Sequence, residues 1–70
     1  MQRYLIIIEK AEGNFSAYSP DLPGCIATGL TREETIKNMQ DAIQLHIRGL
    51  IEDHLPVPDA QTSAEYVTAA

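Results

Sequence analysis

Residues 15–34 constrain the fold more than any other part of the chain, because turn residues divide them into short elements. Leu22-Pro-Gly-Cys25 fits a type II turn, in which Pro23 fixes φ at the second position and Gly24 supplies the positive φ of the third. A strand over residues 25–29 then leads directly into a helix N-terminus. This stretch therefore predicts a strand–turn–strand–helix unit with Gly24 at positive φ.

The helix is predicted to begin at Thr31 and to end near His54. Thr31-Arg-Glu-Glu34 is a capping box, in which the Thr31 hydroxyl accepts from the Glu34 amide and the Glu34 carboxylate reaches back. Pro56 disfavours helical geometry at Leu55 and so sets the end of the helix. Apolar residues at spacings of three and four mark its inner face: Ile36, Met39, Ile43, Ile47 and Leu50.

Strands are predicted on both sides of this helix. Residues 4–9 are Ile-rich, residues 11–14 form a hairpin connection, and residues 15–18 return. Residues 65–68 contain a Tyr-Val pair that favours a last short strand. The chain is thus predicted to be one α+β domain, residues 1–70, of order β-β-β-α-β. A right-handed crossover places the last strand beside the first, which gives sheet order 3-2-1-4 with one helix on one face.

This architecture predicts self-association. One helix can cover only one of the two side-chain sets of the first strand, and an uncovered apolar face is rarely tolerated by a monomer. Chains of 70 residues also have thin cores, so we expect a homo-oligomer, most simply a dimer. The candidate residues are Leu5 and Ile7 on the first strand and Ala42, Leu45 and Gly49 on a second helix stripe. The alternative for that stripe is a tolerated glycine and a singly exposed leucine.

The charge balance is acidic, with ten Asp and Glu against five Lys and Arg. This argues against nucleic acid as a direct ligand, because phosphate binding needs a basic patch. An acidic surface suits a basic protein partner, although modest negative charge also serves solubility alone. Three acidic residues of the outer helix face are the candidate partner contacts: Glu33, Asp41 and Glu52.

Localisation and catalytic potential are read from a few residues. The apolar run near the N-terminus is too short for a signal peptide or a membrane span, and the single Cys25 fits a reducing compartment, so we expect a cytoplasmic protein. His46 and His54 are eight residues apart and cannot chelate one metal locally. We expect no cofactor and no catalytic residue. The one carboxylate combination that could form a metal site is Glu9, Asp21 and Asp53.

A resemblance to a known family adds to this interpretation. The residues that carry it are Tyr18-Ser-Pro-Asp-Leu-Pro-Gly-Cys25, Ala27-Thr-Gly29, Thr31-Arg-Glu-Glu34, and Gly49-Leu-Ile-Glu-Asp53 before Pro56 and Pro58. In this combination the chain resembles the HicB-like antitoxin family over roughly residues 2–58. The resemblance implies a fold like half of a ribonuclease H domain, and a non-enzymatic protein that binds and blocks a small messenger-RNA-cleaving toxin of the HicA type.

Longer members of that family carry a C-terminal DNA-binding domain. Only residues 56–70 follow the helix here, which is too short for such a domain, so this chain resembles the short solitary members and is not expected to regulate an operator by itself. Two alternatives to toxin binding stay open. One is a minimal ribonuclease H-like, metal-dependent nuclease, and the other is a self-associating domain without a toxin partner.

Overall fold

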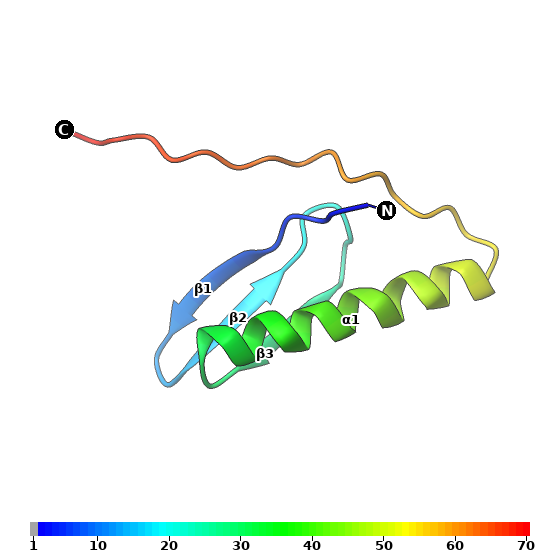
Figure 1. Ribbon diagram of the computed structural model, residues 1–70, viewed down its shortest axis with the longest axis horizontal. Coiled ribbons are helices and arrows are strands. Elements are labelled where there is room, and N and C mark those ends of the chain that lie inside the picture. Colours follow the sequence, from blue (N-terminus) through cyan, green and yellow to red (C-terminus); the bar gives the residue numbers. More distant parts are fainter. Residues whose placement is uncertain (1) are drawn as a thin grey trace.

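A three-stranded sheet and one helix form the body of the protein. The computed structural model describes residues 2–70. It contains β1 (Ile7–Ala11), β2 (Asn14–Tyr18), β3 (Ile26–Gly29) and α1 (Arg32–Glu52). The strands form an antiparallel sheet in the order β1-β2-β3, and α1 packs diagonally across one face (Figure 1). The predicted α+β class, the antiparallel meander and the following helix are confirmed.

The prediction of a fourth strand over residues 65–68 is wrong. The predicted sheet order 3-2-1-4 is therefore correct only for its first three strands. Within residues 2–70 the sheet has three strands, and residues 55–70 form an extended C-terminal arm that passes the N-terminal segment and projects away from the sheet (Figure 1). Residues with high strand propensity form a strand only where they can pack against a surface and pair with a neighbouring strand. Tyr66 is 100% exposed and Val67 89% exposed, so within residues 2–70 this end of the arm has neither a surface to pack against nor a strand to pair with.

The strand register decides which face α1 covers. Ile8 pairs with Ala17, and Ala17 pairs with Ala27, so these three side chains share the face beneath the helix. Buried Met39 of α1 packs against this face. The core consists of Ala17, Leu22, Cys25 and Met39, with Tyr4, Ile6, Ile8, Ala27, Ala42 and Ile43 partly buried around it.

Within residues 2–70, no helix covers the opposite face of the sheet. Ile7 pairs with Tyr18, and Tyr18 with Ile26, so these side chains lie together on that face. Tyr18 and Ile26 are exposed, whereas Leu5 and Ile7 are half-buried. The expectation that one helix hides only one side-chain set of the first strand is therefore confirmed, and the hidden set is Tyr4, Ile6 and Ile8.

The two predicted turns form as expected. Gly13 has φ +85° in the β1–β2 hairpin, and Gly24 has φ +83°. The Cys25 amide donates to the Leu22 carbonyl at 3.0 Å, which closes the turn. β1 begins later than predicted, at Ile7, because the preceding residues lie against the β2–β3 loop, where the buried Ser19 hydroxyl donates to the Leu5 carbonyl at 3.0 Å.

Both ends of α1 are closed by local hydrogen bonds. The Glu34 amide donates to the Thr31 hydroxyl at 3.0 Å, as the capping box predicts, but the Glu34 carboxylate accepts from the Leu30 amide at 2.7 Å, one residue before the cap. At the other end His54 has φ +57°, and the Leu55 amide donates to the Leu50 carbonyl at 2.9 Å. This is a Schellman arrangement with histidine in the position that glycine usually takes.

Candidate protein-binding surfaces

A stripe on the outer side of α1 combines acidic and apolar residues. Asp41, Leu45 and Gly49 follow at spacings of four, and Glu52 lies three residues further, so all four share one face of the helix. Leu45 is 68% exposed, and Asp41 and Glu52 are exposed. A Cβ on Gly49 would meet nothing within 4 Å. We call these four residues the acidic–apolar stripe.

The sequence predicted self-association for Leu45 and Gly49 and partner contacts for Asp41 and Glu52. The structure places these residues on one surface of α1. The remaining residues of those two sets lie elsewhere. Glu33 is exposed in the first turn of α1. Ala42 is half-buried and packs against the core, so it is less exposed than Leu45.

A shallow hollow of about 320 Å³ adjoins the stripe. Leu45, Ala42 and His46 of α1 form one side, and the residues that follow the Pro23-Gly24 turn form the other: Gly24, Cys25 and Ile26. The turn therefore does more than reverse the chain, because it brings exposed Ile26 next to exposed Leu45. Ile26 and His46 were missed as surface candidates, since their proximity depends on how β3 packs against the helix.

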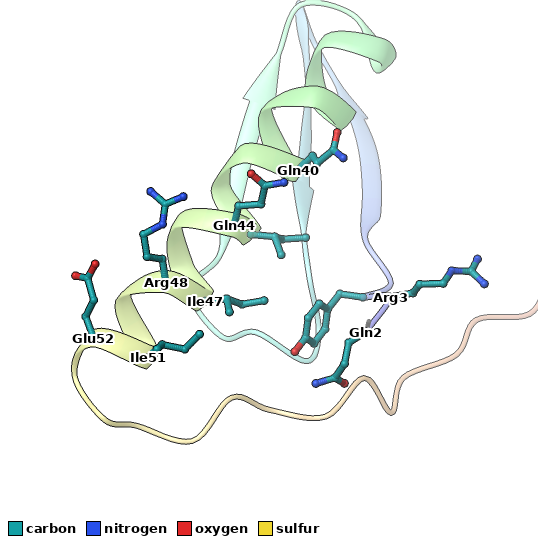
Figure 2. Close-up of a pocket in the computed structure, with 10 residues that line it drawn as sticks. Gln2, Arg3, Gln40, Gln44, Ile47, Arg48, Ile51 and Glu52 are labelled. Atoms are coloured by element: carbon teal, nitrogen blue, oxygen red, sulfur yellow. The ribbon is translucent and has the colours of Figure 1, made fainter.

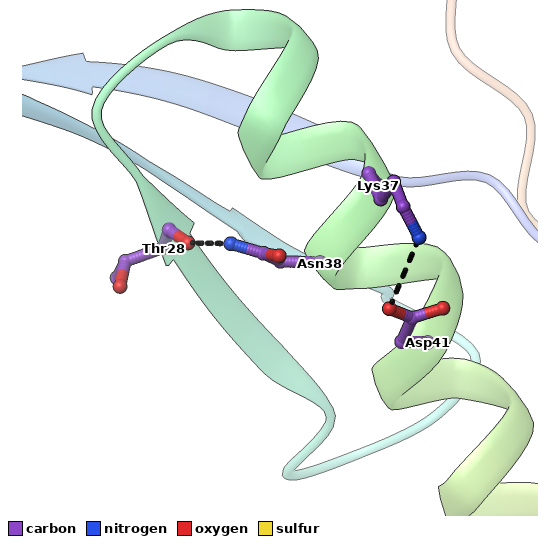
Figure 3. Close-up of polar contacts among 4 residues, drawn as sticks. All are labelled: Thr28, Lys37, Asn38 and Asp41. Atoms are coloured by element: carbon purple, nitrogen blue, oxygen red, sulfur yellow. Dashed lines mark hydrogen bonds and ion pairs between the residues drawn. The ribbon is translucent and has the colours of Figure 1, made fainter.

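Helix α1 closes the outer edge of β3. The Asn38 side-chain amide donates to the Thr28 carbonyl at 2.8 Å (Figure 3). One helical turn before Asn38, Thr35 lies against Gly29 of β3. A Cβ on Gly29 would lie 2.6 Å from Thr35 Oγ1 and 2.7 Å from the Thr35 backbone nitrogen, so only glycine fits this close approach. Nearby, Lys37 and Asp41 form an exposed ion pair at 3.5 Å, which leaves the stripe's first carboxylate only weakly engaged (Figure 3).

A larger groove of about 940 Å³ lies between the second half of α1 and residues 2–4. Ile47 and Ile51 point into it from the helix, and Arg48 and Glu52 border it with their charged ends directed outward (Figure 2). Its far end is closed by the linker after α1, where the Tyr4 hydroxyl donates to the Pro58 carbonyl at 2.6 Å. The groove has an apolar floor and a polar rim that includes Gln2, Gln40 and Gln44.

The structure does not assemble the candidate metal site. Among residues 2–70, no three His, Cys, Asp or Glu side chains form a group that could hold a metal ion, so Glu9, Asp21 and Asp53 do not converge. Asp21 instead accepts from the Thr62 hydroxyl at 2.7 Å and from the amides of Gln61 and Thr62. Hydrogen bonds from Thr62 and Gln61 lower the pKa of the Asp21 carboxyl below its ordinary value of 3.8.

The single cysteine is a packing residue. Cys25 is buried in the core, and burial raises the pKa of its thiol. His46 lines the hollow beside Leu45, and His54 belongs to the helix C-cap. In the part of the chain that the structure describes, no helix is long and apolar enough to span a membrane.

By its fold, this protein is a small α+β domain in which one helix covers a three-stranded antiparallel meander and carries an acidic–apolar stripe on its outer side. Residues 4–70 match the family described as the HicB-like antitoxin of bacterial toxin–antitoxin systems. The chain belongs to this family. The match includes the C-terminal arm, which the resemblance over residues 2–58 did not cover.

Individual relatives agree with this assignment. A UPF0150 protein of Synechocystis sp. is 45% identical over 56 residues, covering 79% of this chain and 71% of the relative. A UPF0150 protein of Thermoplasma acidophilum is 34% identical and covers 94% of both chains. An uncharacterized 14.9 kDa protein of Haemophilus phage HP1 is 36% identical over 91% of this chain, which spans only 48% of that relative.

A solved structure matches the fold. A chain of a HicA3 and HicB3 toxin–antitoxin complex superposes with a TM-score of 0.74 at 33% identity, covering 86% of this chain and 70% of that chain. The similarity therefore extends beyond the sheet and helix into part of the C-terminal arm.

Proposed function

We propose that this protein is an antitoxin that binds a small basic toxin of the HicA type and prevents it from cleaving RNA. The observation that supports this most strongly is the structural match, at 33% identity, to a chain from a HicA3 and HicB3 toxin–antitoxin complex. The family match over residues 4–70 points the same way. In this proposal the protein acts by covering the RNA-binding surface of the toxin and performs no catalysis.

We further propose that the acidic–apolar stripe contacts the toxin. Leu45, which is 68% exposed, supplies apolar area on the surface, and Asp41 and Glu52 flank it with negative charge. With a net charge of −5, the domain attracts a cationic partner over distance. Such complementarity raises the association rate more than the affinity, so added salt should slow complex formation.

Reconstitution with a HicA-like toxin from the same genome tests the proposal. We expect RNA cleavage by the toxin to stop when this protein is present in excess. Leu45→Arg should weaken inhibition at least tenfold, because it replaces apolar contact with repulsion of a basic surface. Thr28→Arg is the matched control, since it adds the same side chain at an exposed position of β3 outside the stripe, the hollow and the groove. Undiminished cleavage at any excess of the wild-type protein would contradict the antitoxin function.

A further inference from the structure

β1 is the unprotected edge of the sheet. In the order β1-β2-β3, only β2 borders β1, so the outward backbone groups of Ile7–Ala11 have no strand beside them. Unpaired edges of this kind recruit further strands unless something covers them. Here the nearest chain segment is the C-terminal arm, which runs alongside at a distance (Figure 1).

A slot of about 520 Å³ separates that edge from the arm. Apolar residues of β1, of β2 and of the segment before β1 line it on one side, and Ala64, Glu65 and Tyr66 of the arm line it on the other. Lys10 and Arg32 also border the slot, and neither forms an ion pair within residues 2–70. The sheet side contributes Leu5, Ile6, Ile7, Ile8 and Phe15. The slot is therefore apolar along β1, with two unpaired cations beside it.

Hydrogen bonds at the root of the arm hold it away from β1. The Pro58 carbonyl accepts from Gln2 and Tyr4, the Ala60 amide donates to Gln2, and Asp21 accepts from residues 61 and 62. Beyond Thr62, no residue of the arm donates or accepts a hydrogen bond in the described structure. The arm is anchored at residues 58–62 and leaves its strand-forming end, Glu65–Thr68, without a ladder.

We propose that the slot of each protein takes the C-terminal arm of a second copy, so that two copies exchange arms in a symmetric dimer. The strand order across the dimer would be β1 of one copy, the partner's arm, the first copy's arm and β1 of the partner. This order satisfies two-fold symmetry, because each arm borders its own slot and fills the partner's. It gives both unpaired edges a ladder and joins the two sheets into one.

The composition of the arm fits this occupant. Tyr66 and Val67 of the second copy supply apolar side chains for an apolar slot. Its Glu65 supplies negative charge for Lys10 and Arg32, which form no ion pair within residues 2–70. Closure by a chain's own arm is disfavoured, because the anchoring bonds of Pro58 and Thr62 fix the arm on the far wall of the slot. The exchange also explains why a segment with strand propensity is extended but unpaired in a single chain.

Sedimentation equilibrium of the protein alone, from micromolar to submillimolar concentration, tests the exchange. We expect a dimer for the wild-type chain and a monomer for Val67→Pro, because proline removes a ladder donor. Val67 is almost fully exposed, so this change cannot unfold the domain. Ala70→Pro, at the last residue, is the matched control and should remain dimeric. A monomeric wild type, or a Val67→Pro variant that still dimerises, would overturn the proposal.

Charge reversal then tests whether the contact is made between copies. Lys10→Glu and Glu65→Lys should each raise the dimer dissociation constant by about twofold to fivefold, the scale of exposed ion pairs. An equal mixture of the two variants should regain wild-type affinity, because in the mixed dimer each slot meets an arm of opposite charge. Failure of the mixture to recover would contradict arm exchange, whereas recovery would exclude a pairing confined to one chain.

Discussion

The two edges of the sheet differ in whether another element of the chain contacts them. α1 covers the outer edge of β3, where Asn38 donates to the Thr28 carbonyl and Gly29 lets the strand touch Thr35. The outer edge of β1 faces a slot, across which the C-terminal arm lies without forming a ladder. At the β3 edge the helix supplies a side-chain hydrogen bond and a close contact, whereas the β1 edge is left open to a further strand.

Chain connectivity explains the difference. Asn38 and Thr28 are ten residues apart, and the capped helix start follows β3 immediately, so closing this edge orders little additional chain. The segment nearest β1 is held by contacts such as Tyr4 to Pro58, 54 residues apart. Because these long-range bonds hold the arm at residues 58–62, its strand-forming end lies across the slot from β1 and not beside it.

The largest expected effect breaks the closed edge. Gly29→Ala places a Cβ 2.7 Å from the Thr35 backbone nitrogen, and α1 must move away from β3 to relieve the overlap. We expect a loss of about 2–3 kcal/mol in the free energy of unfolding, measured by urea denaturation. Gly49→Ala is the control, because the same change there meets no atom within 4 Å and should stabilise the helix by up to about 1 kcal/mol. Equal stability of Gly29→Ala and the wild type would show that β3 and α1 are not in close contact.

The next effect acts on the loop that delivers β3 to the helix. Gly24→Val forces a β-branched residue to φ +83° and should lower the free energy of unfolding by about 1–3 kcal/mol. A Cβ at this position meets open space, so the loss measures backbone strain alone. Pro23→Ala, which keeps the backbone geometry accessible, should cost less than about 1 kcal/mol. An unchanged denaturation midpoint for Gly24→Val would rule out the turn.

A smaller effect opens the β3 edge without moving the helix. Asn38→Ala removes the bond to the Thr28 carbonyl and should cost about 1 kcal/mol in the free energy of unfolding. Lys37→Ala, which breaks only the exposed ion pair with Asp41, should cost less than about 0.5 kcal/mol. Hydrogen exchange at β3 should rise in the first variant and stay constant in the second, and the reverse result would contradict this role of Asn38.

The smallest effect concerns the open edge and depends on pH. Because the pKa of Asp21 is lower in the folded protein than its ordinary value of 3.8, its contribution is complete above pH 3.8 and is lost as pH falls through the folded value. The root of the arm should therefore detach in acid, detected as a chemical-shift change at the Thr62 amide. Asp21→Asn should weaken this attachment at neutral pH, and Asp59→Asn should leave it intact. If the Thr62 amide chemical shift changed neither in acid nor in Asp21→Asn, Asp21 would not anchor the arm.

Local chemistry in the sequence determined much of the fold. Pro23 and Gly24 define a turn within four residues, and Thr31 and Glu34 define a helix start. These predictions are confirmed because the interactions that decide them span only a few residues. The family could also be predicted, since the order of turn and capped helix is unusual.

Only the tertiary structure decided what happens at the edges and on the outer helix face. The propensity of Tyr66 and Val67 predicted a fourth strand, but pairing requires a partner at the right distance, and the bonds of Pro58 and Asp21 keep the arm away from β1. The stripe that joins Leu45 to Asp41 and Glu52, and the glycine contact with Thr35, likewise follow from how α1 packs on the sheet. Turn geometry and short-range hydrogen bonds depend on residues that are neighbours in the sequence. The packing of distant segments depends on contacts among all elements of the folded chain.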